Sequence, residues 1–242
     1  MKARIIKDYH PTSHEITEDF LVNNNDWDLI ELNYNLDIEK LTAWYKQINE
    51  QFNFMRFNFN ENSSRLNLEV SRKMVEEGYC GYYCGPIDGI TFAWPIERYE
   101  PLPPPQQCNP EIFPEVNTDT FFDDAKIMSK MRFGYLEEMI NALGEDAFRQ
   151  MIITTHHAGM YIKQHLDSKT LKLHIPVDTN PNAKFHFGPN KEREYHMKLG
   201  KIYILNTGDW HGTSNESEES RSHIITRIAP WHLLKVIELI ND

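Results

Sequence analysis

Short runs rich in β-branched and aromatic residues, each ended by turn-forming residues, recur through the second half of the chain. Runs of this length and composition predict β-strands, and the short connections between them favour antiparallel pairing. We therefore expect the second half of the chain to form an antiparallel β domain. The predicted strands cover residues 150–156, 170–177, 183–187, 201–206 and 221–228.

The first half of the chain contains one clear helical pattern, at residues 37–52. Asp37 stands at its start, which is a favourable place for an acidic residue. A second helix is predicted across residues 122–142, and a third, short one across residues 144–150. We expect such helices to pack against the outside of the β domain. The apolar face of the first helix consists of Leu41, Trp44, Tyr45 and Ile48.

No internal repeat and no low-complexity linker divides the chain, so one domain spanning residues 1–242 is expected. Within it, residues 1–147 are expected to form helices and to flank the substrate, and residues 148–232 to form the β core with the metal site. Residues 85–89 are predicted to be a turn, and the proline-rich residues 101–107 a stiff extended connection.

Composition narrows the classes of function. The formal net charge of −11 disfavours nucleic-acid backbones and anionic membrane surfaces as partners. No apolar run reaches the roughly 18 residues of a membrane-spanning helix. The N-terminal residues lack the apolar core of a secretory signal, so we expect a cytoplasmic protein.

The cysteines Cys80, Cys84 and Cys108 are few and odd in number. This argues against a disulfide framework and fits a reducing compartment. Cys80 and Cys84 lack the second pair that a structural zinc site needs, so we interpret all three cysteines as small buried residues. The sequence leaves the oligomeric state open.

His165, Asp167 and His211 are the candidate metal ligands. A His-X-Asp tripeptide arises easily by chance in a chain with 11 histidines, and a lone histidine is more often a hydrogen-bonded structural residue. Residues two apart on a strand share a face, so His165 and Asp167 are expected to point inward together at a barrel mouth. With His211 from a later strand they make the two-imidazole, one-carboxylate set of non-haem Fe(II) oxygenases.

Arg221 adds a candidate anion site beside the metal. It follows the polar segment 215–220, which we interpret as a hairpin loop that returns the chain towards His211. A guanidinium group binds a carboxylate through two parallel hydrogen bonds and stays charged when partly buried. One iron and one dicarboxylate are therefore expected in the same cavity.

A resemblance to a known family rests on the segments 159–167, 171–177 and 200–206, together with His211 and Arg221. In combination and spacing these resemble the aspartyl/asparaginyl β-hydroxylase family of 2-oxoglutarate-dependent dioxygenases, and free-proline hydroxylases show a similar pattern. The resemblance implies a mainly β fold with flanking helices. Its core would be a double-stranded β-helix, a cupin-like jelly roll, packed by N-terminal α/β elements.

The resemblance also implies an iron site. His165 and His211 would bind Fe(II), with Asp167 as the third ligand. The namesakes of the family have a glycine where Asp167 stands, so this site is more similar to the complete triad of the proline hydroxylases. This departure counts against a halogenase, and it weakens the inference that the substrate is an aspartyl residue.

For the cosubstrate, the resemblance implies that Arg221 pairs with the distal carboxylate of 2-oxoglutarate. His174 and Thr154 stand where the family places hydrogen-bonding groups for it. Lys172 stands where a namesake has arginine. A lysine lacks the planar fork of arginine, so the alternative is that Lys172 has no role in the site and faces solvent.

The implied reaction is the O2-dependent hydroxylation of an unactivated C–H bond, with conversion of 2-oxoglutarate to succinate and CO2. The substrate would be a free amino acid or an amino-acid residue of a peptide, and desaturation would use the same residues. Arg227 shares the period-two face of Arg221 and is a candidate for a substrate carboxylate, the alternative being an arginine that extends to solvent. The alternative function is a non-catalytic cupin-like module that binds metal or small acids.

Overall fold

The computed structural model describes residues 27–51, 132–148, 151–167 and 171–240. It also describes short segments towards the N-terminus, at residues 3–7, 10–12, 16–17, 20–21, 55–57, 81–84, 90–93, 96–97 and 126–127. The turn predicted at residues 85–89, the extended segment at 101–107 and the cysteine side chains lie outside the described residues.

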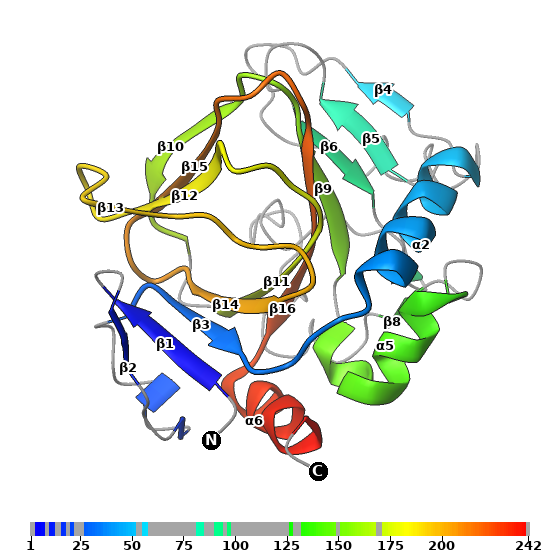
Figure 1. The fold of residues 1–242 in the computed structure, drawn as a ribbon, viewed down its shortest axis with the longest axis horizontal. Coiled ribbons are helices and arrows are strands. Elements are labelled where there is room, and N and C mark those ends of the chain that lie inside the picture. The colour runs from blue at the N-terminus through cyan, green and yellow to red at the C-terminus, as the bar shows by residue number, and fades with distance from the viewer. Residues whose placement is uncertain are drawn as a thin grey trace, which may run out of the picture.

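Except for β12 and β13, which pair within one sheet, successive strands from β9 to β16 lie in alternate antiparallel sheets that face each other (Figure 1). In the large sheet they are ordered β14-β11-β16-β9, and the small sheet is ordered β10-β15-β12-β13. This winding of one chain between two facing sheets is a double-stranded β-helix, so the predicted fold class is confirmed. The large-sheet strands are β9 (Ile152–His156), β11 (Leu171–Asp178), β14 (Ile202–Asn206) and β16 (Arg221–Ile228). The small-sheet strands are β10 (Tyr161–His165), β12 (Ala183–Phe187), β13 (Arg193–Tyr195) and β15 (His211–Asn215).

Short strands from the N-terminal half extend the large sheet at both edges. Beside β14 lie β3 (Leu29–Leu32), β1 (Ala3–Lys7) and β2 (His10–Thr12). Beside β9 lie β6 (Ile90–Ala93), β5 (Gly81–Cys84) and β4 (Met55–Phe57). A separate pair consists of β7 (Ile96–Glu97) and β8 (Lys126–Ile127). Segments this short carry too few residues to show a period in the sequence.

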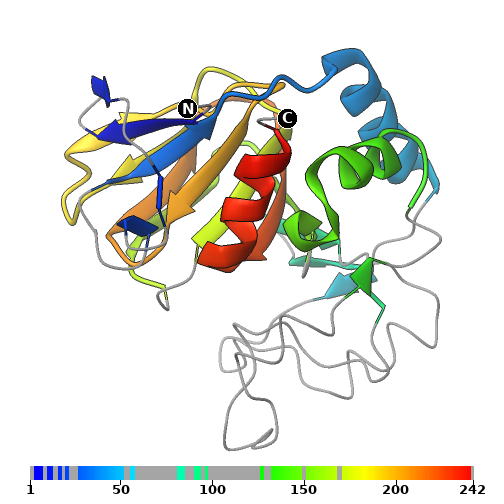
Figure 2. The ribbon, with the colours of Figure 1, turned by 90° about the horizontal axis from the view of Figure 1, so that it is seen from below.

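Helices cover the outer face of the large sheet (Figure 2). The predicted helix at 37–52 is confirmed as α2 (Ile38–Gln51). The helix predicted across 122–142 is confirmed in its last part as α5 (Tyr135–Leu143), but it is wrong at Lys126–Ile127, which is a strand, and at residues 132–134, which are not helical. Gly134 precedes α5 with φ +55°, a conformation that a continuous helix does not allow.

The short helix predicted at 144–150 is a single 3-10 turn, η3 (Glu145–Phe148). A C-terminal helix, α6 (Pro230–Leu239), was not predicted; its proline stands in the first turn, where the missing N–H costs nothing. None of the helices in the described part of the chain has the length and apolar character of a membrane span.

Alternation along the strands separates two environments. On β11 the side chains of Leu171, Leu173, Ile175 and Val177 pack towards the helices, and each fully buried side chain of this kind contributes roughly 1.5–3 kcal/mol. The intervening Lys172 and His174 share the opposite face, which looks into the barrel. A second apolar cluster, which includes Phe185, Phe187, Tyr203 and Leu205, fills part of the barrel interior. The remainder of that interior is polar, and it contains the site.

Candidate active site

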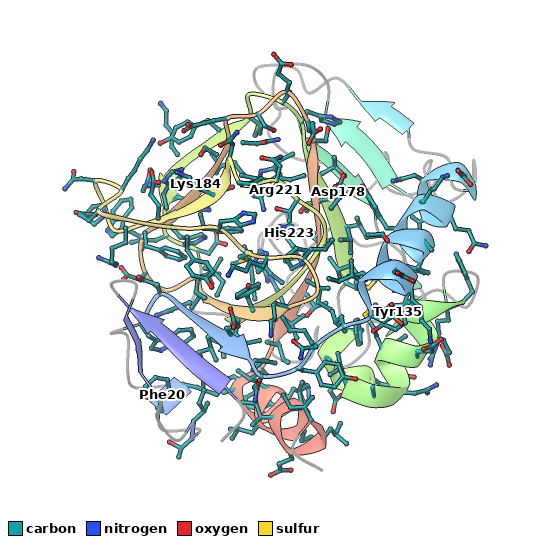
Figure 3. All side chains as sticks on the ribbon, viewed as in Figure 1. Phe20, Tyr135, Asp178, Lys184, Arg221 and His223 are labelled. Atoms are coloured by element: carbon teal, nitrogen blue, oxygen red, sulfur yellow. The ribbon has the colours of Figure 1, made fainter. Side chains whose placement is uncertain are left out.

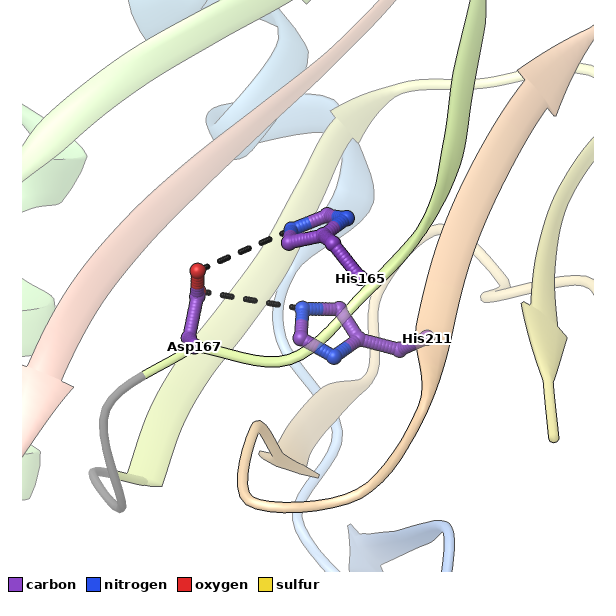
Figure 4. A group of neighbouring side chains, drawn as sticks. All are labelled: His165, Asp167 and His211. Atoms are coloured by element: carbon purple, nitrogen blue, oxygen red, sulfur yellow. Dashed lines mark ion pairs between the residues drawn. The ribbon is translucent and has the colours of Figure 1, made fainter. Parts of the chain in front are cut away.

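His165, Asp167 and His211 converge on one point (Figure 4). One ligand atom from each lies within 4.8 Å of those from the other two. The Oδ1 atom of Asp167 is 3.6 Å from Nε2 of His165, and its Oδ2 atom is 3.7 Å from Nε2 of His211. The structure therefore brings the three predicted ligands together, and in the described part of the chain they are the one group with this geometry.

A β-bulge in β10 aims His165 at this point. Ile162 pairs with Thr213 and His165 pairs with His211, so three steps along β10 match two steps along β15. The extra residue reverses which side chains of β10 point inward, so that His165 and not Gln164 lies opposite His211.

Gly212 makes room for the bulge. A Cβ atom at this position would lie 2.7 Å from the carbonyl oxygen of Ile162 and 3.1 Å from the backbone nitrogen of Gln164. Both neighbours are backbone atoms, which cannot swing away as a side chain does. The glycine next to His211 is therefore required by the close approach of β10 and β15.

The sequence predicted Asp167 on the same strand as His165, but in the structure it lies beyond the end of β10. Its backbone N–H donates to the carbonyl oxygen of Thr207, at 3.1 Å. Thr207 follows β14, in the connection that leads to His211. The carboxylate is thus positioned by a contact between two loops. One loop follows β10, which carries His165, and the other precedes β15, which carries His211.

Both candidate imidazoles are held in the same way. Nδ1 of His165 donates to the carbonyl oxygen of Lys163 at 2.8 Å, and Nδ1 of His211 donates to that of Asp209 at 2.9 Å. A carbonyl oxygen only accepts, so each Nδ1 carries the proton and each Nε2 presents a lone pair. This is the arrangement by which an outer partner orients a metal-bound histidine.

Lys172 contacts the third ligand. Its ammonium group forms a short ion pair with Oδ2 of Asp167, and its side chain is only 15% exposed. The alternative that Lys172 faces solvent is therefore wrong. Burial opposes ionisation of Asp167, but the neighbouring His211 and the charge and hydrogen bond of Lys172 outweigh it and hold the pKa of the carboxyl below its usual range. The residue is a carboxylate, as a metal ligand must be.

Exposure across the triad is graded. The side chain of His165 is 40% exposed and that of Asp167 is 22% exposed, whereas His211 is 5% exposed. The exposed residues Leu166 and Trp210 stand beside the first and last of these ligands. The site thus opens to the surface on the His165 side. Two imidazole nitrogens and one carboxylate on an accessible side of the barrel fit Fe(II) with coordination positions left for other ligands.

Arg221 lies inside the barrel, next to His223 (Figure 3). Its Nη2 atom donates to the hydroxyl oxygen of Thr213 and to Nδ1 of His156, the latter at 3.0 Å. Its Nη1 atom lies 3.2 Å from Nε2 of His223. The guanidinium carbon lies 4.8 Å from the centre of the Phe185 ring. The cation is therefore fixed by neutral groups on its own strand β16 and on three others, β9, β12 and β15.

Among the described residues, no carboxylate pairs with Arg221. Burial alone lowers the pKa of its guanidinium to about 9. Two buried nitrogens in this region, Nε of Arg221 and Nε2 of His174, have no hydrogen-bond partner within the described residues. A buried cation with unused donors is costly unless an anion completes it, so the pocket fits a carboxylate.

Three imidazoles surround this cation. Burial holds the pKa values of His156, His174 and His223 well below their usual range, and the charge of Arg221 lowers them further. All three are neutral near pH 7. His174 was predicted in this region from the sequence, whereas His156 and His223 were not assigned to the pocket. The signal was present, because His223 is two residues from Arg221 and His156 is two residues from Thr154.

Thr154 and Arg227 complete the set of predicted residues. Thr154 is buried and lies opposite His223 in the pairing of β9 with β16. Arg227 is 9% exposed, so it does not extend into solvent, and it lies opposite Lys172 in the pairing of β11 with β16. Arg221, His223 and Arg227 thus lie along one face of β16.

The segment before Arg221 is not the predicted hairpin loop, because β15 and β16 belong to different sheets. It carries the chain from the small sheet to the large one. Asn215, fully buried, ties this crossing to β9: its side-chain amide donates to the carbonyl oxygens of His156 at 3.1 Å and of Glu219 at 2.7 Å. Asn215 therefore sets the position at which β16 begins with Arg221.

Comparison with solved structures gives low scores. A prolyl-4-hydroxylase from Pseudomonas putida has a TM-score of 0.41 and 10% identity, over 88% of this chain and 95% of that one. An oxidoreductase of the 2OG-Fe(II) oxygenase family from Burkholderia pseudomallei has a TM-score of 0.38 and 10% identity, over 73% and 94%. The Cnp3 cupin domain from Schizosaccharomyces pombe has a TM-score of 0.28 and 11% identity, over 33% of this chain and 54% of that one. The chain thus spans about half the length of that cupin domain, and the fold assignment rests on the strand order described above.

Comparison at the level of sequence is more specific. No curated protein matches the chain. Residues 126–230 match the model of one family, described as aspartyl/asparaginyl beta-hydroxylase. The matched segment contains β9 to β16, with the triad and Arg221. The family expected from the sequence is therefore the one whose model residues 126–230 match.

Proposed function

We propose that the protein is an Fe(II)- and 2-oxoglutarate-dependent dioxygenase that hydroxylates an unactivated C–H bond. The observation that carries this proposal is the presence of two complementary sites in one barrel. One is a set of two imidazoles and one carboxylate, and the other is a buried arginine for which the described residues supply no carboxylate. A module that only held a metal would have no use for the second site.

His165, Asp167 and His211 would hold the iron, and Arg221 would bind the distal carboxylate of 2-oxoglutarate. His174 and Thr154 are the further candidates for contact with this cosubstrate, since His174 has an unused ring nitrogen and Thr154 lies opposite His223. When bound, Fe(II) with 2-oxoglutarate and O2 would supply the oxidising chemistry, with succinate and CO2 as products.

The tasks of the chain itself are orientation and exclusion. The carbonyl groups of Lys163 and Asp209 fix the two imidazoles before any metal binds, so little reorganisation is required. The small sheet, with the aromatic rings of Phe185 and Phe187, closes the inner side of the barrel to water. The half-exposed side chain of His165 leaves the substrate one direction of approach.

For the substrate we propose a free amino acid or an amino-acid residue of a peptide, with a carboxylate bound near Arg227. Arg227 lies opposite Lys172 in the strand pair, which places its cation on the side of the barrel where Lys172 contacts Asp167. Succinate release in the presence of a panel of free amino acids tests this class of substrate. Activity that is unaffected by Arg227→Ala would remove Arg227 from the proposal.

The central experiment is an anaerobic titration of the metal-free protein with Fe(II) and then with 2-oxoglutarate. We expect the weak visible charge-transfer band of a bidentate keto-acid complex. The band should be lost in His165→Ala and retained in His157→Ala, a histidine that hydrogen-bonds with Ser220 outside the triad. Absence of the band in folded, iron-loaded protein would favour a non-oxidising cupin-like module that binds metal or small acids.

A further inference from the structure

The contacts of Arg221 define the proton positions on the imidazoles around it. A guanidinium group only donates hydrogen bonds. Nδ1 of His156, at 3.0 Å from Nη2, must therefore accept, and so must the nitrogen of His223 that faces Nη1 at 3.2 Å. Both histidines present lone pairs to the cation, which is the role that a carboxylate has in an ordinary ion pair.

A carboxylate that binds Arg221 competes for these same donors. Nε of Arg221 has no partner within the described residues, and the fork that it forms with a terminal nitrogen suits both oxygens of one carboxylate. As the anion takes over guanidinium N–H groups, the imidazoles lose the donor they faced. They then lie beside the negatively charged carboxylate, to which a protonated imidazole can donate a hydrogen bond.

We propose that His156 and His223 are part of the carboxylate site, and that binding of a carboxylate at Arg221 is accompanied by uptake of a proton by this histidine pair. The inference rests on the proposed function, because it takes the distal carboxylate of 2-oxoglutarate as the natural ligand. It goes beyond that function in assigning two further binding residues and a proton to the binding step.

The surroundings of the pair contain positive and neutral groups. His223 faces Arg221 on its own strand, His156 on β9, His174 on β11 and the ring of Phe185 on β12, and His196 also acts on it. His156 faces Arg221, with His174 and His157 as further influences. Lys172 and His211 act on the region through His174. Because none of the groups that act most strongly on His156 or His223 is a carboxylate, an incoming anion changes their environment strongly.

The sign of the pH dependence follows from this environment. Without ligand, burial and Arg221 keep the pKa values of both histidines well below their usual range. A bound carboxylate raises them. Between the free and bound pKa values, binding takes up a proton, so affinity falls by up to about tenfold for each unit of rising pH.

The test is calorimetric titration of the full chain, freed of metal by a chelator, with glutarate, a dicarboxylate that lacks the keto group. Titrations in phosphate and in Tris at about pH 7 give the number of protons taken up, because the two buffers differ in ionisation enthalpy. We expect the wild-type protein to take up about one proton for each glutarate bound.

Variants separate the pair from its neighbours. Glutamine can donate and accept hydrogen bonds but cannot take up a proton at this pH. His156→Gln and His223→Gln should each reduce the uptake, and the double variant should abolish it and flatten the pH dependence of glutarate affinity. His157→Gln changes a histidine adjacent to His156 that hydrogen-bonds with Ser220, and it should retain the uptake of the wild type.

Glutarate binding without proton uptake would overturn the inference, as would full uptake in the double variant or no binding of glutarate. None of these results depends on iron. The charge-transfer band of the Fe(II) and 2-oxoglutarate complex, measured on the same preparations, tests the proposed function separately. A protein that shows the band and binds glutarate without a proton would keep the function and lose this inference.

Discussion

His165 on β10 and His211 on β15 lie opposite each other in one strand pair, with their ring centroids 4.4 Å apart. Each ring is tethered to a backbone carbonyl group two residues earlier in the chain. The geometry of the candidate iron site is thus supported by the β-sheet and not by the metal. Metal binding and folding should consequently be separable.

Replacing His165 with alanine tests that separation. Since its ring is 40% exposed, we expect a change in unfolding free energy within about 0.5 kcal/mol. Fe(II) affinity should fall by more than the roughly 100-fold that loss of an outer partner causes, since a direct ligand is removed. Denaturant unfolding and an anaerobic iron titration measure the two quantities. A variant that kept full iron affinity would exclude His165 as a ligand.

Lys172 should act as a positioning residue for Asp167. Its ammonium group holds Oδ2 of the carboxylate, so Lys172→Met should weaken Fe(II) binding by about tenfold, as loss of an outer partner does. Lys172→Arg keeps the charge and the donor and should restore most of the affinity. Equal iron affinity in the wild type and in Lys172→Met would show that the ion pair does not contribute to metal binding.

Arg221→Met should separate stability from binding. The cation is buried without a carboxylate partner among the described residues, so an apolar side chain of similar length should leave stability unchanged or raise it. Loss of a charge-assisted contact should weaken 2-oxoglutarate binding by roughly 10- to 100-fold, while Fe(II) binding persists. Thermal unfolding and ligand titration give the two results. A large loss of stability would mean that Arg221 has a structural role.

Stability should fall as pH falls through about 6.5, the usual pKa of histidine. His156, His174 and His223 have lowered pKa values in the folded protein, so below this pH the unfolded chain binds more protons. Each such histidine contributes a slope of about 1.4 kcal/mol per pH unit until its folded pKa is reached. Urea unfolding across this range, repeated with His223→Gln, should show a shallower slope in the variant.

Asn215→Ala should be destabilising by about 3 kcal/mol, because it removes the donor to buried backbone carbonyl groups, including those of His156 and Glu219. The same change should weaken glutarate binding, since it loosens the start of β16 at Arg221. Ser217→Ala is a matched control, because its hydroxyl also bonds to the carbonyl oxygen of Glu219 but lies at the exposed side of the crossing. A variant as stable as the wild type would show that the crossing is held by other contacts.

The ligand set could be predicted because it depends on local spacing and on residue chemistry. His165 and Asp167 are close in sequence, and two imidazoles with one carboxylate are the ligand set of non-haem Fe(II) oxygenases. The strands around them could also be placed, since β11, β12, β14 and β16 are each within a residue or two of the predicted bounds. These elements are long enough for their period to show.

Features that depend on pairing between distant segments could not be predicted. The ion pair of Lys172 with Asp167 forms only because the loop after β10 lies over β11. The segment before β16 looks like a hairpin loop unless β15 and β16 are known to belong to different sheets. The helix expected across 122–142 begins only at Tyr135 because Gly134 interrupts it, although the apolar spacing continues. The two-residue spacing places His156 on the same face of β9 as Thr154, but its contact with Arg221 requires β9 and β16 to be neighbours, which the pattern of neither strand reveals.

The bulge opposite Gly212 has a consequence for how related sequences are compared. The bulge changes which residues of β10 point into the barrel. Before it the even-numbered residues point inward, and after it the odd-numbered ones do. A chain with the same three ligands but a regular β10 would present the residue equivalent to Gln164 to the metal. A single methyl group at Gly212, which touches no ligand, would press on the backbone that makes the shift. A residue larger than glycine at position 212 would thus require β10 to move away from β15, and with it the side chain of His165 that faces His211.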